Sequence, residues 1–145
     1  MRSRVRWLLA ALFVAHGSIH SLGFIWAFDL AEISELGGPS LLIPDAEHGD
    51  PTLIAFGMLW LVSMLAFLGA GWAVATGSGW WPKLAGMAGA VSLVPTVAWW
   101  DDAWRGALIS LVILAVVGLP GGRSMLEGDR TNSDVAEAAR PPTAQ

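Results

Sequence analysis

The sequence predicts an all-α protein: a bundle of four transmembrane helices with both ends of the chain in the cytoplasm. Three observations support this fold class. Hydrophobic residues make up 54% of the 145 residues, charged residues only 14%, and the charges are confined to a few segments. An ordinary globular domain has roughly 25% charged residues. Apolar runs of about 20 residues are long enough to cross a hydrocarbon core of roughly 30 Å.

The apolar runs give the order of the elements. The four predicted helices lie near residues 6–28, 52–75, 82–100 and 103–120. Residues 1–120 therefore form one transmembrane domain, and the polar residues 121–145 predict a disordered cytoplasmic tail. The first run follows a basic start, as a signal peptide does. Its length and the lack of a small-x-small cleavage site favour a retained helix instead.

Charge and tryptophan placement predict the orientation. Seven of the eight basic residues fall at one set of helix ends, and Arg105 falls at the other set with eight carboxylates. The positive-inside rule then places both termini in the cytoplasm, so we expect a multi-pass protein of the bacterial inner membrane. Eight of the nine tryptophans fall near the predicted membrane interfaces, and Trp60 lies inside the second helix.

Local signals mark the helix ends and the long outer loop. Asp50 and Pro51 predict the start of the second helix, and Asp101 or Asp102 is expected to cap the fourth. In the acidic loop 29–51, the first residues can extend helix 1 by two turns to residues 37–39. The apolar residues 39–44 then either enter the mouth of the bundle or lie on the membrane. The loop is a simple cap or a place to look for function.

A set of polar residues recurs at similar depths. His16 and His20 lie one turn apart on one face of the first helix. From the rise of about 1.5 Å per residue, His20 lies about 12 Å below the outer end, and His16 one turn deeper. Three interpretations remain open: the groups satisfy one another, they mark a ligand, ion or proton path, or they face lipid or a neighbouring protomer. The full predicted set is His16, His20, Trp60, Ser63, Ser92 and Ser110, with Asp50, Asp101 and Asp102 at the outer mouth.

The residue types restrict the chemistry of this layer. The chain has no cysteine, which excludes disulfides and thiolate metal sites. A metal bound by two histidines needs a third ligand, and the carboxylates lie about 10 Å higher. Two histidines on one helix face cannot ligate both faces of a haem. No metal or cofactor is predicted; a single histidine could still ligate a haem, and a quinone or other lipid-soluble ligand fits better. A proton path to the acidic outer mouth is a further alternative.

Small residues in the second and third helices favour close helix packing, within the bundle or against a second copy or a membrane-protein partner. The sequence has no phosphate-binding loop and no basic patch beyond the topology signal, so no nucleic-acid partner is expected. The small residues concerned are Gly69, Gly71, Ala85, Gly86, Gly89 and Ala90.

Three segments resemble a family of small, uncharacterised bacterial membrane proteins: "HGSIHSLGF", "FGMLWLVSMLAFLGAG" and "WWDDAWRGALISLVIL". The resemblance covers about residues 5–119 and implies a four-helix fold and its topology, with no activity attached. The architecture is also similar to that of DoxX-like proteins, by analogy of fold alone. A threonine and an asparagine common in the last helix of the family stand here as Ala107 and Ser110. The matching residues are His16, Gly17, His20, Gly23, Phe24, Trp60, Trp100, Asp102, Ala103 and Gly106.

These observations favour a non-enzymatic structural or accessory membrane protein surrounded by the lipid bilayer. Two alternatives stay open: a binder of a lipid-soluble or redox ligand, such as a quinone, through the His/Trp/Ser layer, and a small transporter or proton path.

Overall fold

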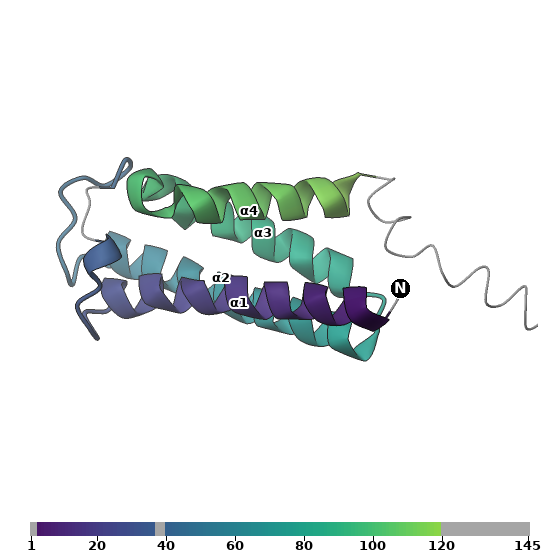
Figure 1. Cartoon of the computed structure of the whole chain (residues 1–145). Helices are drawn as coiled ribbons and strands as arrows, with labels where there is room; N and C mark the ends of the chain where they lie inside the picture. The colour runs from purple at the N-terminus through teal and green to yellow at the C-terminus, as the bar shows by residue number, and fades with distance from the viewer. Residues whose placement is uncertain (1–2, 37–39, 120–145) are drawn as a thin grey trace, which may run out of the picture.

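The computed structural model describes residues 3–36 and 40–119, and in these the chain forms an all-α bundle (Figure 1). Each helix boundary lies within three residues of the predicted one, which confirms the all-α, four-helix prediction. The predicted tail, 121–145, lies outside the described residues. The elements are α1 (Ser3–Ala27), the short 3-10 helix η1 (Ser34–Leu36), α2 (Pro51–Thr76), α3 (Trp81–Ala98) and α4 (Trp100–Gly118).

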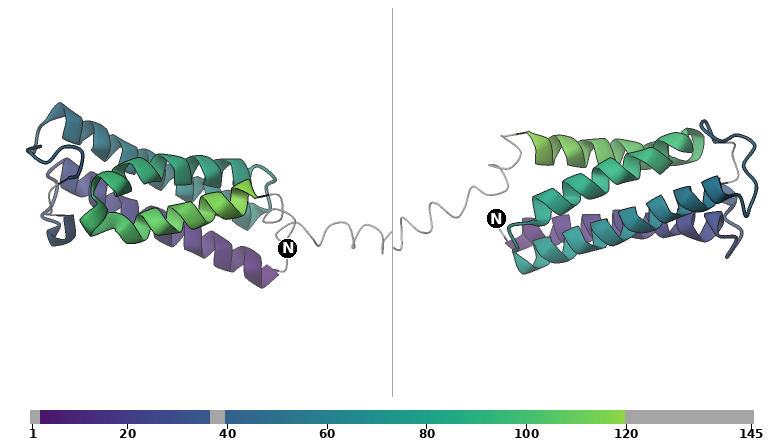
Figure 2. Two further views of the ribbon diagram at one scale, coloured as in Figure 1. Left: turned by 90° about the horizontal axis from the view of Figure 1, so that it is seen from above. Right: turned by 180° about the vertical axis from the view of Figure 1, so that it is seen from behind.

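The helices run up and down in chain order. The start of α1, the α2–α3 link and the end of α4 lie at one end of the bundle, here called the inner end (Figure 1). The α1–α2 loop and the α3–α4 junction lie at the other, outer end. Extensive packing joins α1 to α2, α2 to α3 and α3 to α4, and α1 and α4 make no comparable contact. Seen from behind, α3 runs obliquely from α2 toward α4 (Figure 2).

The two predicted aspartate caps have different outcomes. Asp50 is the N-cap of α2, where its carboxylate accepts a hydrogen bond from the Thr52 backbone N–H at 2.8 Å, and Pro51 follows as the first helical residue. The predicted aspartate cap of α4 is wrong. Because α4 begins at Trp100, Asp101 and Asp102 lie within its first turn. There their negative charges interact favourably with the positive end of the helix dipole.

The predicted two-turn extension of α1 is wrong. The helix ends at Ala27, and Asp29 takes a left-handed conformation with φ of 52°. The Asp29 N–H bonds the carbonyl of Trp26 at 3.0 Å, and the Leu30 N–H bonds that of Ile25 at 2.9 Å. This pair of bonds is a Schellman ending, which satisfies the last carbonyls and turns the chain away. The predicted end of the extension, residues 37–39, lies outside the described residues.

The loop segment that begins at Ser40 is attached to the outer end of α3. The Ser40 hydroxyl donates to the carbonyl of Ala98 at 3.1 Å, and the Leu41 N–H donates to the same carbonyl at 2.7 Å. Ser40 is buried and Ile43 packs on the outer core, whereas Leu41 and Leu42 are about 60% exposed. One part of the segment therefore enters the bundle mouth, which is one of the two predicted placements, and the other part remains exposed.

The core has an inner part of phenylalanine and aliphatic residues and an outer part that contains two tryptophans. The inner part includes Phe13, Phe67 and Val74. In the outer part, the ring centroid of Trp99 lies 5.1 Å from that of Trp60 and 5.2 Å from that of Phe56. Trp99 lies at the outer end, as predicted, but it is 2% exposed, because it forms the α3–α4 corner and its ring lies within the outer core.

The exterior of the bundle, along the sides of the four helices, is largely apolar. Two segments, Arg4–Ala27 and Pro51–Thr76, are long and apolar enough to cross a membrane. Large apolar side chains are exposed on every helix, for example Leu8 and Leu12 on α1 and Leu65 on α2. They are also exposed on the two shorter helices: Met87, Val94 and Val97 on α3, and Leu108, Leu111, Val112 and Val116 on α4.

Candidate functional site

His16 and His20 face the interior of the bundle, each 3% exposed. The His20 ring lies parallel to that of Phe67, with centroids 5.7 Å apart, and the His16 ring meets Phe67 edge to face at 4.7 Å. Gly17 lets α2 approach this closely, since a Cβ there would lie 2.9 Å from the Cβ of Phe67. The interpretation with both rings facing lipid does not agree with this burial.

The two histidines are joined through two serines. The Ser92 hydroxyl lies 3.0 Å from Nε2 of His20 and 2.9 Å from the Ser110 hydroxyl. The Ser110 hydroxyl lies 3.3 Å from Nε2 of His16. This sequence of contacts, His20–Ser92–Ser110–His16, is called the polar chain below. It connects α1, α3 and α4 within the bundle, and both serines are fully buried.

Two members of the predicted layer lie apart from the polar chain. The Ser63 hydroxyl donates to the carbonyl of Leu59 in its own helix at 2.8 Å. Trp60 is buried and lies against Gly23, whose missing side chain leaves room for the indole ring. The depth of each residue was predictable from the helical rise. Ser63 is buried, as predicted, but its hydroxyl bonds its own helix, and this local choice of partner was not predictable.

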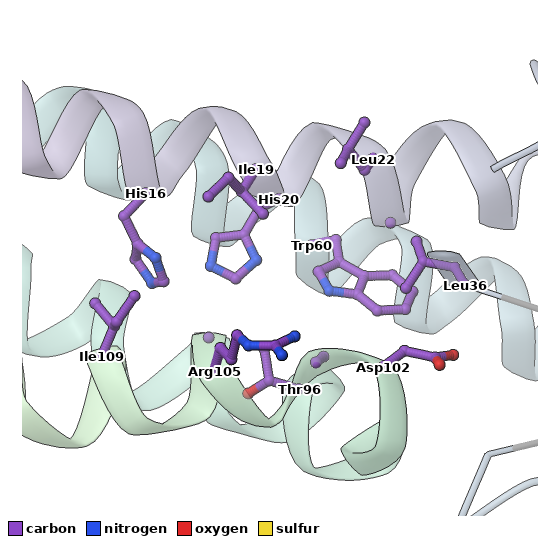
Figure 3. A pocket seen from close by; sticks show the side chains of 13 residues that line it. His16, Ile19, His20, Leu22, Leu36, Trp60, Thr96, Asp102, Arg105 and Ile109 are labelled. Atoms are coloured by element: carbon purple, nitrogen blue, oxygen red, sulfur yellow. The ribbon is translucent and has the colours of Figure 1, made fainter. Parts of the chain in front are cut away.

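A cavity of about 260 Å³ lies between α1 and α4 and reaches His16 and His20. Figure 3 shows both rings extending from α1 toward α4, with Trp60 nearer the outer end. The cavity opens at the side of the bundle, because Ile19 and Leu22 line it and are also exposed. Its lining is His16, Ile19, His20, Leu22, Gly23, Leu36, Trp60, Thr96, Asp102, Ala103, Arg105, Gly106 and Ile109.

Sequence reasoning missed several lining residues, including Thr96 and Arg105. The Thr96 hydroxyl donates to the carbonyl of Ser92 at 2.7 Å. Its position four residues after Ser92 places it on the same face of α3, which was the available signal. Arg105 lies over the ring of Trp104, 4.8 Å from its centroid, near the outer end of α4. The sequence contained no signal that Arg105 would line the cavity.

The three aspartates of the predicted outer mouth do not converge on the cavity. Asp102 lines it, Asp101 is exposed, and Asp50 caps α2. Nearby in the outer loop, Nδ1 of His48 lies 3.5 Å from the carboxylate of Asp29. Among the described residues, no three histidine or acidic side chains are close enough to hold a metal ion.

Buried polar residues are confined to the outer half and the midplane of the bundle. In the described ranges 4–15, 64–91 and 111–119, none of the buried residues is polar. Nδ1 of His16 is enclosed and has no hydrogen-bond partner among the described residues. The polar chain therefore ends at His16, above an apolar inner core.

No family model, curated protein sequence or solved structure matches the chain. The class of protein is therefore defined by the geometry above: an all-α bundle with an apolar exterior, a buried polar chain and a lateral cavity that reaches it.

Proposed function

We propose that this chain is a four-span protein of the bacterial inner membrane that binds a lipid-soluble ligand in the α1–α4 cavity and catalyses no reaction. The observation that carries the proposal is the cavity itself. It opens through an apolar side of the bundle and leads to the buried His20 and His16. Ligand sites are typically apolar concavities with a few convergent polar groups, and ionisable residues inside membranes are commonly functional.

The exterior of α3 and α4 supports four spans. With 18 and 19 residues, these helices are roughly 27–29 Å long, close to the thickness of the hydrocarbon core. Their exposed side chains include Met87 and Val94 on α3 and Leu111 and Val112 on α4. Monomeric soluble proteins rarely expose apolar patches that extend around the whole molecule. A hydrocarbon environment removes this cost for every helix.

The charge distribution supports cytoplasmic termini. Arg4, Arg6 and Lys83 lie at the inner end of the bundle, whereas the outer end carries Asp29, Asp101 and other carboxylates. The positive-inside rule places the inner end in the cytoplasm.

The orientation can be tested with single cysteines, because the natural sequence has none. Glu47→Cys lies in the exposed outer loop, and Gly79→Cys lies in the exposed α2–α3 link. In intact spheroplasts, an impermeant maleimide should label Glu47→Cys and leave Gly79→Cys unlabelled until the membrane is permeabilised. The reverse pattern contradicts the orientation. Labelling of both sites in intact spheroplasts contradicts the single span, α2, that separates them.

Two observations favour a ligand binder over the other functions suggested by the sequence. The predicted packing glycines face neighbouring helices: Gly71 contacts α1 near Ala10, and Gly89 contacts α4 near Ser110. They therefore give no argument for a partner subunit. A proton path would have to continue inward from His16, where the buried residues of the described chain are apolar.

The cavity can be tested by filling it. Ala103→Trp places a large side chain among the lining residues, and Ala90→Trp adds the same side chain at an exposed position of α3 as a control. Wild type and the control, purified from native membranes, should retain a lipid-soluble compound that mass spectrometry of the organic extract detects. Ala103→Trp should lose it. Identical extracts from all three proteins contradict the proposal.

A further inference from the structure

The number of hydrogen atoms in the polar chain restricts the tautomers of its histidines. Three contacts need three hydrogens, and the hydroxyls of Ser92 and Ser110 supply two. At least one imidazole therefore donates from Nε2. If both did, a fourth hydrogen would remain on a buried serine with no acceptor in the described structure. Since an unpaired buried donor is costly, one ring donates and the other accepts.

The surroundings of His16 decide which ring donates. Nδ1 of His16 is enclosed and unpartnered within the described residues. A hydrogen on that nitrogen would be a buried donor without an acceptor, whereas a bare lone pair costs less. His16 therefore carries its hydrogen on Nε2 and donates to Ser110. Ser110 donates to Ser92, and Ser92 donates to Nε2 of His20.

This order leaves the hydrogen of a neutral His20 on Nδ1. That nitrogen has no hydrogen-bond partner among the described residues, and unlike Nδ1 of His16 it is not fully enclosed by protein atoms. His20 itself lines the cavity, into which its ring extends (Figure 3). The cavity therefore receives one unpaired N–H donor, which needs an acceptor.

The rest of the lining describes the body of the acceptor. Trp60 provides an aromatic surface near His20, and Ile19, Leu22 and Ile109 are apolar. At the outer end, the opposite charges of Asp102 and Arg105 give no preference for a charged ligand. The volume, about 260 Å³, lies just below the roughly 300–1,000 Å³ of sites for drug-sized ligands, so the bound part is small.

We propose that the cavity binds a neutral, planar ring carbonyl compound, of which a quinone head group is an example, and that Nδ1–H of His20 donates to its carbonyl oxygen. His16 is a positioning residue, because it acts on His20 through Ser110 and Ser92. This inference rests on the proposed function and adds the chemical class of the ligand.

The hydrogen order is testable without any ligand. In protein labelled with ¹⁵N-histidine, the ring nitrogen shifts and their couplings to the ring protons distinguish the tautomers. The expected result is Nε2–H for His16 and Nδ1–H for His20. Ser110→Ala breaks the link between the two rings, so His20 should then show a mixture of both tautomers. Ser63→Ala, at a buried serine outside the polar chain, should leave both unchanged. An Nε2–H signal from wild-type His20 overturns the inference.

The ligand class is tested with two rings of nearly equal shape, 1,4-naphthoquinone and naphthalene. Each is titrated into the detergent-solubilised protein while the His20 ring signals are followed. The quinone should bind about tenfold more tightly, as expected for one added hydrogen bond. His20→Phe should lower quinone affinity to that of naphthalene, and retained naphthalene binding shows that the variant is folded.

Equal affinities in the wild type overturn the ligand class and leave the proposed function standing. Binding of neither ring overturns the inference, and the proposed function fails only if Ala103→Trp also leaves the native extract unchanged.

Discussion

The hydroxyl oxygens of Ser92 on α3 and Ser110 on α4 lie 2.9 Å apart. The approach depends on Gly89, one turn before Ser92, because a Cβ at Gly89 would lie 3.3 Å from the backbone carbonyl oxygen of Ser110. Two short side chains can therefore bond across the helix pair. Their remaining hydrogen-bonding capacity is directed to the histidines of α1, so one contact holds three helices in register.

Replacing either serine of this contact should destabilise the bundle. Ser92→Ala and Ser110→Ala each interrupt the polar chain and leave a buried polar neighbour unpaired, at an expected cost of about 1 kcal/mol. The double variant should cost less than the two single changes together, because both remove the same bond. Thermal unfolding in detergent measures the stability of the wild type, the two single variants and the double variant. Strict additivity would contradict the shared bond, and Ser18→Ala, at an exposed serine of α1, is the control.

Gly23→Ala should move Trp60. A Cβ at Gly23 would overlap the indole ring, which lines the same cavity, so the ring must shift and change the cavity wall. The expected results are a changed tryptophan emission spectrum and weaker binding of the cavity ligand. Gly118→Ala is the matched control, since a Cβ there meets no atom within 4 Å. An unchanged spectrum and unchanged binding would show that the contact between Gly23 and Trp60 is not tight.

Gly17→Ala should weaken the α1–α2 contact. Its Cβ would lie 2.9 Å from the Cβ of Phe67 and 3.2 Å from the backbone oxygen of Met64, and neither atom is the end of a flexible side chain. Such overpacking typically costs about 1–3 kcal/mol, measured as a lower thermal midpoint. Gly86→Ala meets Val117 at an ordinary 3.5 Å and should have little effect. Equal midpoints for the two variants would rule out a specific role for Gly17.

Ser40→Ala should loosen the outer loop while the helices stay intact. The hydroxyl donates to the carbonyl of Ala98 and accepts from the N–H groups of Leu42 and Ile43 at 3.2 and 3.3 Å, so one substitution removes three contacts. Hydrogen exchange should increase in residues 40–46 and remain unchanged in α2. Ser34→Ala, at an exposed serine of the same loop, should not reproduce the effect.

Depth along a helix was predictable from the sequence, and rotation about the helix was not. A fixed rise per residue placed His20, Ser92 and Ser110 at similar depths, and these residues do form hydrogen bonds. Trp99 shows the limit. It lies at the outer end, as predicted, but its ring is directed into the core. Rotation depends on which neighbour a helix packs against, and that information is not local.

The cavity was unpredictable for a related reason. It exists because α1 and α4 lack the close packing that joins the other neighbouring helices, and an absence of packing leaves no periodic signal in either segment. The end of α1 near residue 28 was predictable, whereas the turn that follows was not, because it depends on the left-handed conformation of Asp29.

Because each helix packs mainly on the one before it in the chain, most contacts of this bundle join segments that are close in sequence. Low contact order of this kind allows rapid assembly, in the order in which the helices leave the ribosome. The polar chain is the exception. Its last link, from Ser110 to His16, spans 94 residues and can form only after α4 has arrived. The histidines therefore complete their hydrogen bonds only after the three later helices have been made, which makes the candidate site the last part of the molecule to mature.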